Sequence, residues 1–313
     1  MIKTSVMIKK TLSIAFCLVF ASSLLFSAEN VFSQTPLPTI VIQSDGTILP
    51  SSAPIVQKGN TYTLTEDLYS TLKIQKSNIV LDGDGHTLYG SYNGTAMDVW
   101  VLGEGPDQLP TGTLAQYTIG IDLNSKTVQG VTIQNLNIHN FSIGMYIWTK
   151  NNTITGNSVF QNIVGILLSG ENETVTGNYI ENNQRGLFFG FNNEGDTIPP
   201  DIEINHNHFE NNVIQLNGCQ CKYLNSTEPP HDWDNGKEGN YWSDYNGTDS
   251  NHDGIGDTPY FIDALNLDRY PLMNSPLKSE NSLAPIYLAA SGLIAATFIV
   301  TTVALVWRKH RRK

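Results

Sequence analysis

The chain has 313 residues, which is enough for one elongated domain with short terminal segments. Charged residues make up 15% of it, and 29 acidic residues against 18 basic ones give a formal net charge of −11. Eight of the basic residues lie in the first ten and last six positions, so the body between them is more acidic still. Such a body repels nucleic-acid phosphates, and we therefore exclude nucleic acid as a partner.

Residues 1–28 have the pattern of a secretory signal peptide. Residues 1–10 are short and basic, residues 11–26 are apolar, and small residues follow at Ser27 and Ala28. This pattern predicts export of the chain, with cleavage between Ser22 and Gln34. An uncleaved N-terminal anchor is the alternative.

The segment before the repeats has β character. Asn78–Leu88 is typical of a strand, a Gly-rich turn and a second strand. We interpret Asp82, Asp84 and His86 as turn residues, with a catalytic acid cluster as the alternative. Gly103–Gly112 is rich in Gly and Pro and is predicted to protrude as a loop, a common place for a ligand contact.

The stretch from Val131 to Gly218 repeats with a period of 21 residues. Gly144, Gly165 and Gly186 share one phase, and a fourth copy follows after eight inserted residues. Apolar residues recur at i and i+2 within each copy, which is the spacing of strands. A repeat of this length predicts a solenoid whose coils stack at roughly 4.8 Å, so residues 40–218 are predicted to form a parallel β-helix.

Two columns of asparagine accompany the apolar columns. They are Asn157, Asn178 and Asn207, and Asn162, Asn183 and Asn212. Stacked amides in turns can hydrogen-bond along the axis of a solenoid. The glycine column fits positions that need a positive φ or have no room for a Cβ atom. A leucine-rich repeat would instead require leucine columns and a helical half.

The C-terminal part contains a membrane segment. Residues 219–274 form a region rich in Asp, Trp and Tyr, and residues 275–285 form a polar linker. The uncharged stretch Ile286–Val306 is long enough for a helix to cross roughly 30 Å of hydrocarbon. With Trp307 at the interface, residues 286–307 are predicted to be a transmembrane helix and the basic residues 308–313 a cytoplasmic tail. This predicts a single-pass protein of the cell membrane whose ectodomain is extracellular or periplasmic.

Asp249–Asp257 matches the first nine positions of an EF-hand-type loop. Its predicted calcium ligands are Asp249, Asn251, Asp253, the Ile255 carbonyl and Asp257. Gly254 supplies the sharp turn, but position 12 holds Tyr260 in place of a bidentate acid. We predict a structural calcium ion here, and a metal-free Asp/Gly turn is the alternative.

A second candidate metal site combines two alternating pairs, His206 with His208 and Cys219 with Cys221. Residues at i and i+2 of a strand share a face, so each pair could offer two ligands to zinc or copper. The repeat register also allows the histidines to lie on the outer surface at a turn. The cysteines could instead form a disulfide or stay free.

Six Asn-x-Ser/Thr sequons are candidates for glycosylation of an exported chain. They begin at Asn93, Asn140, Asn151, Asn172, Asn225 and Asn246. In the repeat, a structural role for asparagine is the alternative.

The regular coils contain few acidic residues. From Gly130 to Leu187 these are Glu171, Glu173 and Glu181, and no pair of them recurs on successive coils. We therefore expect a binding protein, with a polysaccharide lyase or glycoside hydrolase as an alternative.

The segment GNYWSDYNGTDSNHDGIGDTPYFID, followed by LDRYPLM, resembles the C-terminal signature of the NosD-like β-helix family. The TGN coils and the opening NIVLDGDGHTLYG are similar to that family too. The resemblance covers residues 40–273 and implies a right-handed, three-sheet β-helix exported from the cell. The family takes its name from a periplasmic protein implicated in copper-site maturation, so it also implies copper handling as an alternative. The predicted anchor favours a cell-surface protein that binds carbohydrate or another surface component.

Overall fold

The computed structural model describes residues 37–92, 118–125, 127–190, 201–217, 231–262 and 266–275. All regular elements within these ranges are strands. The predicted signal peptide, the loop at Gly103–Gly112 and the predicted membrane segment at 286–307 lie outside them. Within the described ranges there is no helix that could span a membrane.

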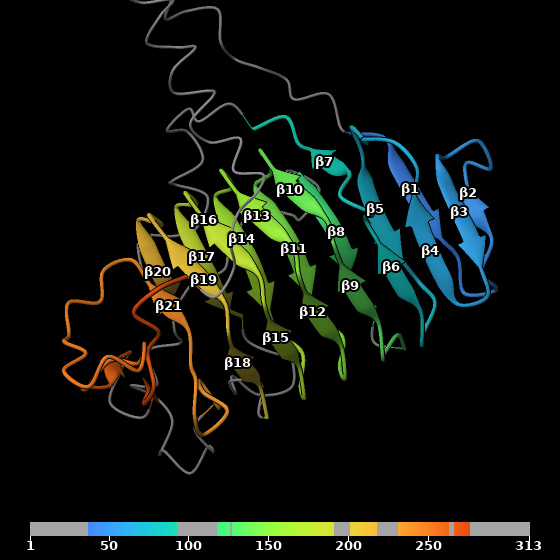
Figure 1. Cartoon of the computed structure of the whole chain (residues 1–313). Coiled ribbons are helices and arrows are strands. Elements are labelled where there is room, and N and C mark those ends of the chain that lie inside the picture. The colour runs from blue at the N-terminus through green and yellow to red at the C-terminus, as the bar shows by residue number, and fades with distance from the viewer. Residues whose placement is uncertain are drawn as a thin grey trace, which may run out of the picture.

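The strands form three long sheets that wind around one core (Figure 1). Sheet A has the order β2 (Ile48–Leu49), β1 (Thr39–Ile42), β5 (Thr71–Ile74), β8 (Ile119–Leu123), β11 (Ile143–Ile147), β14 (Val164–Leu168), β17 (Arg185–Phe189), β20 (Ile214–Asn217). Sheet B has the order β18 (Glu203–Asn205), β15 (Thr174–Thr176), β12 (Thr153–Thr155), β9 (Thr132–Gln134), β6 (Val80–Asp82), β4 (Thr61–Leu64), β3 (Ile55–Lys58). Sheet C has the order β21 (Tyr241–Trp242), β19 (His208–Glu210), β16 (Tyr179–Glu181), β13 (Ser158–Phe160), β10 (Asn137–His139), β7 (Thr87–Tyr89). A separate hairpin pairs β22 (Tyr260–Phe261) with β23 (Leu267–Asp268).

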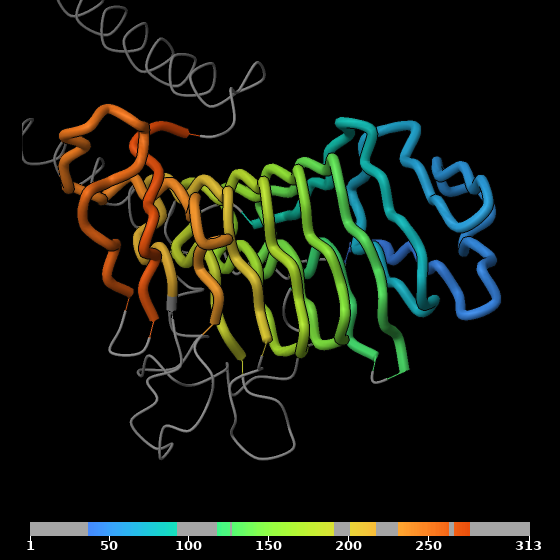
Figure 2. Tube along the Cα trace, turned by 60° about the horizontal axis from the view of Figure 1, so that its bottom comes forward, coloured from blue at the N-terminus to red at the C-terminus, as the bar shows by residue number. Residues whose placement is uncertain are grey.

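The register of the sheets reproduces the sequence period. Ile133, Ile154 and Val175 are parallel partners on successive strands of sheet B, and Ile204 follows them across the insertion. Each coil adds one strand to every sheet, and the coils follow one another along the axis (Figure 2). The predicted parallel β-helix is therefore confirmed.

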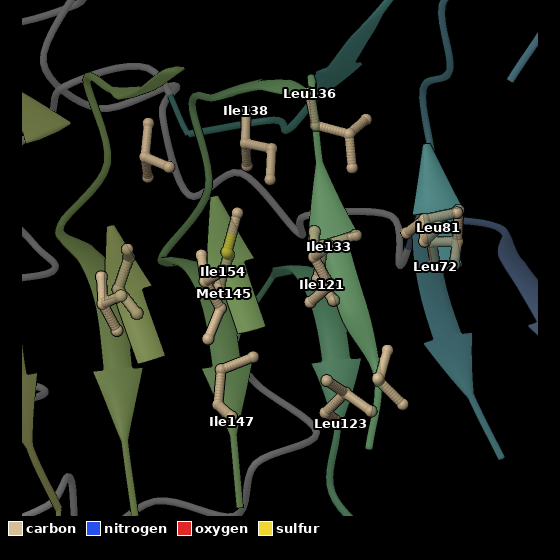
Figure 3. Close-up of a cluster of buried hydrophobic side chains, with 14 of the residues drawn as sticks. Leu72, Leu81, Ile121, Leu123, Ile133, Leu136, Ile138, Met145, Ile147 and Ile154 are labelled. Atoms are coloured by element: carbon tan, nitrogen blue, oxygen red, sulfur yellow. The ribbon is translucent and has the colours of Figure 1, made fainter. Parts of the chain in front are cut away.

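The core is a stack of equivalent apolar side chains. Ile121, Met145, Ile166 and Leu187 are in register in sheet A, and all four are fully buried. Figure 3 shows two of them, Ile121 and Met145, next to Ile133 and Ile154 of sheet B. Burial of one such side chain stabilises the fold by roughly 1.5–3 kcal/mol, so the repeated columns are its main source of stability.

The asparagine columns form hydrogen-bonded ladders at the corners. The backbone N–H of Asn157 donates to Oδ1 of Asn178 at 3.0 Å, and Asn178 donates in the same way to Asn207 at 3.0 Å. Asn207 continues the ladder to Asn240, also at 3.0 Å. The second predicted column forms an equivalent ladder through Asn162, Asn183 and Asn212.

The glycine column is explained by close packing. A Cβ atom on Gly165 would lie 2.6 Å from the carbonyl oxygen of Gly186 on the next coil, and Gly144 meets Gly165 in the same way. These glycines are therefore needed because there is no room for a side chain.

The β-helix continues beyond residue 218. β21 pairs in parallel with β19, and the Trp242 ring stacks on Phe209 at 4.4 Å. Tyr260 stacks on the other side of Trp242 at 4.3 Å. At the N-terminal end, antiparallel hairpins β1–β2 and β3–β4 close the first coils. Such caps protect the open ends of a solenoid from edge-to-edge association.

Candidate functional site

The calcium-type loop places several predicted ligands side by side. The two carboxylate oxygens of Asp249 accept hydrogen bonds from the backbone N–H groups of Asp253 (3.1 Å) and Gly254 (3.0 Å). Asn251 donates from Nδ2 to Asp253 at 2.9 Å, and the N–H of Ile255 donates to the other oxygen of Asp253 at 2.9 Å. The turn predicted at Gly254 is present, with φ of 88°.

Asp257 points to a different set of partners. Its Oδ2 accepts from the hydroxyl and N–H of Ser250 (2.7 and 2.9 Å) and from the hydroxyl of Thr248 (3.0 Å). The hydroxyl and N–H of Ser250, followed by the Thr248 hydroxyl, lower the pKa of Asp257. Across the described ranges, no three His, Cys, Asp or Glu side chains are grouped as a metal site. The structural calcium ion stays a prediction.

The two candidate histidines face different partners. His206 lies in a corner with φ of 56°, and its Nε2 is 2.7 Å from Glu238. His208 lies on β19, where Nε2 is 2.6 Å from Glu210. Because a corner separates the two, they do not share a strand face as the spacing alone suggested. Cys219 and Cys221 lie outside the described residues.

Four of the six sequons fall in the described part of the chain. Asn151 and Asn172 are exposed and stack in a corner, with Nδ2 of Asn172 donating to Oδ1 of Asn151 at 2.7 Å. Asn140 lies in another corner with φ of 62°, and Asn246 is exposed beside the calcium-type loop. Asn93 and Asn225 lie outside the described residues.

The outer face of sheet C carries a continuous row of aromatic side chains. Tyr69 stacks on Tyr89 at 4.7 Å, the Tyr89 ring meets His139 at 4.6 Å, and His139 stacks on Phe160 at 4.6 Å. Burial lowers the pKa of His139, which favours a neutral ring. Tyr69 ends the row and is 66% exposed.

Two glutamates continue this row on the next two coils. Glu181 is the register partner of Phe160, and Glu210 is the register partner of Glu181. Strands in register are roughly 4.8 Å apart, so the two carboxylates share one small region. Burial and then the charge of Glu210 raise the pKa of Glu181.

Aromatic rings also flank the glutamates from a parallel column. His208 lies between Tyr179 at 4.9 Å and Tyr241 at 4.6 Å and is 5% exposed. Its Nε2 holds the carboxylate of Glu210 at 2.6 Å. The arrangement thus combines two carboxylates, a buried imidazole and tyrosine hydroxyls on one outer face, which can accept and donate hydrogen bonds to a polyhydroxylated ligand.

Comparison with known proteins gives two matches. The family model described as right handed beta helix region matches residues 113–229. A probable ABC transporter binding protein NosD from Stutzerimonas stutzeri is 42% identical over 78 residues. These matches support the resemblance of the chain to NosD-like right-handed β-helix proteins. The match covers 22% of this chain and 17% of the relative, so this NosD-like chain is similar to only a small part of that protein.

The matched β-helix region includes both glutamates of the outer face. Glu181 and Glu210 lie within residues 113–229, whereas the loop Asp249–Asp257 follows them. In this NosD-like chain the glutamate pair is thus part of the repeated coils. The pair is not evident within the regular coils from Gly130 to Leu187, because Glu210 lies one coil beyond them.

Proposed function

We propose that this NosD-like chain is a cell-surface protein that binds an extended carbohydrate across the outer face of sheet C. The observation that supports this most strongly is the in-register pair Glu181 and Glu210, in line with His139 and Phe160. In this proposal the ectodomain lies outside the cell. The transmembrane helix that the sequence predicts at residues 286–307 anchors it in the membrane.

The repeated geometry favours a linear polymer over a compact ligand. Successive coils present equivalent positions at roughly 4.8 Å, so a chain of sugar units laid across them meets similar groups several times. Tyr69 stacks on Tyr89 and His139 stacks on Phe160, so these rings cover faces of one another. The carboxylates are therefore assigned the main contacts with sugar hydroxyls, and the exposed ring of Tyr69 a stacking contact.

The test is binding of the full chain, in detergent, to a panel of neutral and acidic polysaccharides. The double variant Glu181→Gln, Glu210→Gln keeps the side-chain shape and removes both charges. Hydrogen bonds to charged groups contribute about 1.5–3 kcal/mol, so we expect affinity to fall by at least about tenfold. Glu203→Gln is the matched control, because Glu203 is exposed on sheet B. Absence of binding to every polysaccharide would refute the proposal.

Copper handling, which the family resemblance of the sequence implies, is a second candidate function. It would use His206 and His208 with Cys219 and Cys221, and copper as the metal. Elemental analysis of the wild-type chain and of a variant with both cysteines changed to serine would test it. Equal copper content in the two proteins would remove this candidate.

A further inference from the structure

The outer face of sheet A is apolar and largely buried. Its side chains are Tyr92, Ile119, Ile143, Tyr146, Ile163, Val164, Leu167 and Phe188. Arg185 lies among them on β17, with Val164 and Ile214 as its register partners on either side. A guanidinium group is thus placed in a column whose neighbours are uncharged.

The charge of Arg185 has no partner among the described residues. Its Nη1 atom is fully enclosed and donates no hydrogen bond to any described residue. The contact that the guanidinium does make is with the ring of Phe188, 5.5 Å from its centroid. Burial lowers the pKa of Arg185, with no acidic neighbour to offset it. Arginine nevertheless stays charged in proteins.

Another cation of sheet A, Lys73, does have an acidic partner. Lys73 of β5 donates to Asp122 of β8 at 2.9 Å. Removal of a charge from water without a counter-charge costs several kcal/mol, and a chain rich in carboxylates has many ways to supply one. None of the described carboxylates pairs with Arg185, so its guanidinium is able to take an anion from outside the chain.

The surroundings of Arg185 suit a sugar that carries the anion. Gln184, the residue before Arg185, donates from Nε2 to the hydroxyl of Tyr92 at 2.8 Å, and Tyr92 belongs to the same cluster as Phe188. Cation, aromatic ring and neutral polar groups together match an oxyanion on a ring with hydroxyls, and a bare inorganic anion would use the cation alone.

We propose that Arg185 anchors a subsite for an acidic sugar, with the guanidinium holding its carboxylate or sulfate. The site lies on sheet A, so it goes beyond the proposed binding at the outer face of sheet C. Its test does not depend on that binding.

The experiment is titration of the full chain with oligogalacturonate, a sulfated oligosaccharide, a neutral oligosaccharide and inorganic phosphate at low salt. We expect one or both acidic sugars to bind and the neutral one to bind at least about tenfold more weakly. Arg185→Met should weaken acidic-sugar binding by about tenfold to a hundredfold. Lys73→Met removes a positive charge elsewhere on the same sheet. It should change the affinity for acidic sugars less than twofold.

Arg185→Lys separates charge from geometry. It keeps the cation but loses the planar fork, and it should retain the native melting temperature while binding acidic sugars several-fold more weakly. Equal binding by wild type and Arg185→Met would overturn the proposal. So would equal affinity for phosphate and the acidic sugars, or no binding of either sugar.

Discussion

Asn178→Ala is the sharpest test of the ladder that holds the coils together. Asn178 is fully buried, and its Oδ1 accepts from both the backbone N–H and Nδ2 of Asn157 at 3.0 Å. Its own Nδ2 donates to the carbonyl of Ile154 at 2.8 Å and to Asn207 at 3.0 Å. Alanine removes all of these side-chain bonds at once.

The expected loss follows from the groups left behind. Nδ2 of Asn157 still donates to the carbonyls of Ile133 and Thr155, but its backbone N–H has no other acceptor among the described residues. One unsatisfied buried donor costs about 1–3 kcal/mol, and the small cavity adds about 1 kcal/mol. We therefore expect the free energy of unfolding to fall by about 2–4 kcal/mol.

Urea unfolding followed by circular dichroism would measure this loss. The midpoint should fall while the slope stays unchanged, since the folded and unfolded states expose the same surface as before. Asn172→Ala is the matched control, because the exposed Asn172 donates to Asn151 at a corner and its loss should cost less than about 0.5 kcal/mol. Equal losses for the two variants would refute the role given to burial.

Three further predictions concern pH, metal and packing. Burial raises the pKa of Glu173 from 4.5 to about 8, so its protonated form favours the folded state, and stability should fall as pH rises through that range. Glu173→Gln should flatten this fall in melting temperature, and an unchanged slope would contradict it. Chelation of calcium should lower the melting temperature of wild type but not of Asp249→Asn, and no effect on wild type would mean an empty loop. Gly165→Ala should cost about 1–3 kcal/mol by urea unfolding, because Cβ would lie 2.6 Å from the Gly186 carbonyl; a neutral effect would contradict the packing argument.

The regular coils could be predicted because each residue type there has one role. The spacing that joins Ile133 to Ile154 and Val175 in the sequence is the register of sheet B. The asparagine columns were predicted equally well, since a side chain that bonds to its copy on the next coil must recur with the coil. Both features depend on local chemistry repeated at a fixed interval.

The fourth copy was predicted across its insertion, since Asn207 follows Asn178 after 29 residues as the sequence columns indicated. The coil after it was not predicted, because Asn240 follows Asn207 only after 33 residues. Insertions at corners change the chain length of a coil but not its hydrogen-bonded register, so Asn240 and β21 fall outside the repeat that the sequence shows. The lack of a partner for Arg185 could not be predicted either, because it is a property of the surroundings of Arg185 in space.

The ladder through Asn178, Asn207 and Asn240 ends at an acidic residue, Asp268, and its hydrogen bonds explain why. Each asparagine accepts at Oδ1 and donates at Nδ2, so the chain of bonds continues only while another coil follows. At the last rung, the carboxylate of Asp268 accepts from the N–H of Asn240 (2.7 Å), Nε1 of Trp242 (2.9 Å) and the N–H of Tyr270 (3.1 Å). These three donors occupy both oxygens, and an amide would turn an NH₂ group toward at least one of them. Asp268, which is fully buried, thus ends the ladder and joins it to the aromatic cap through Trp242.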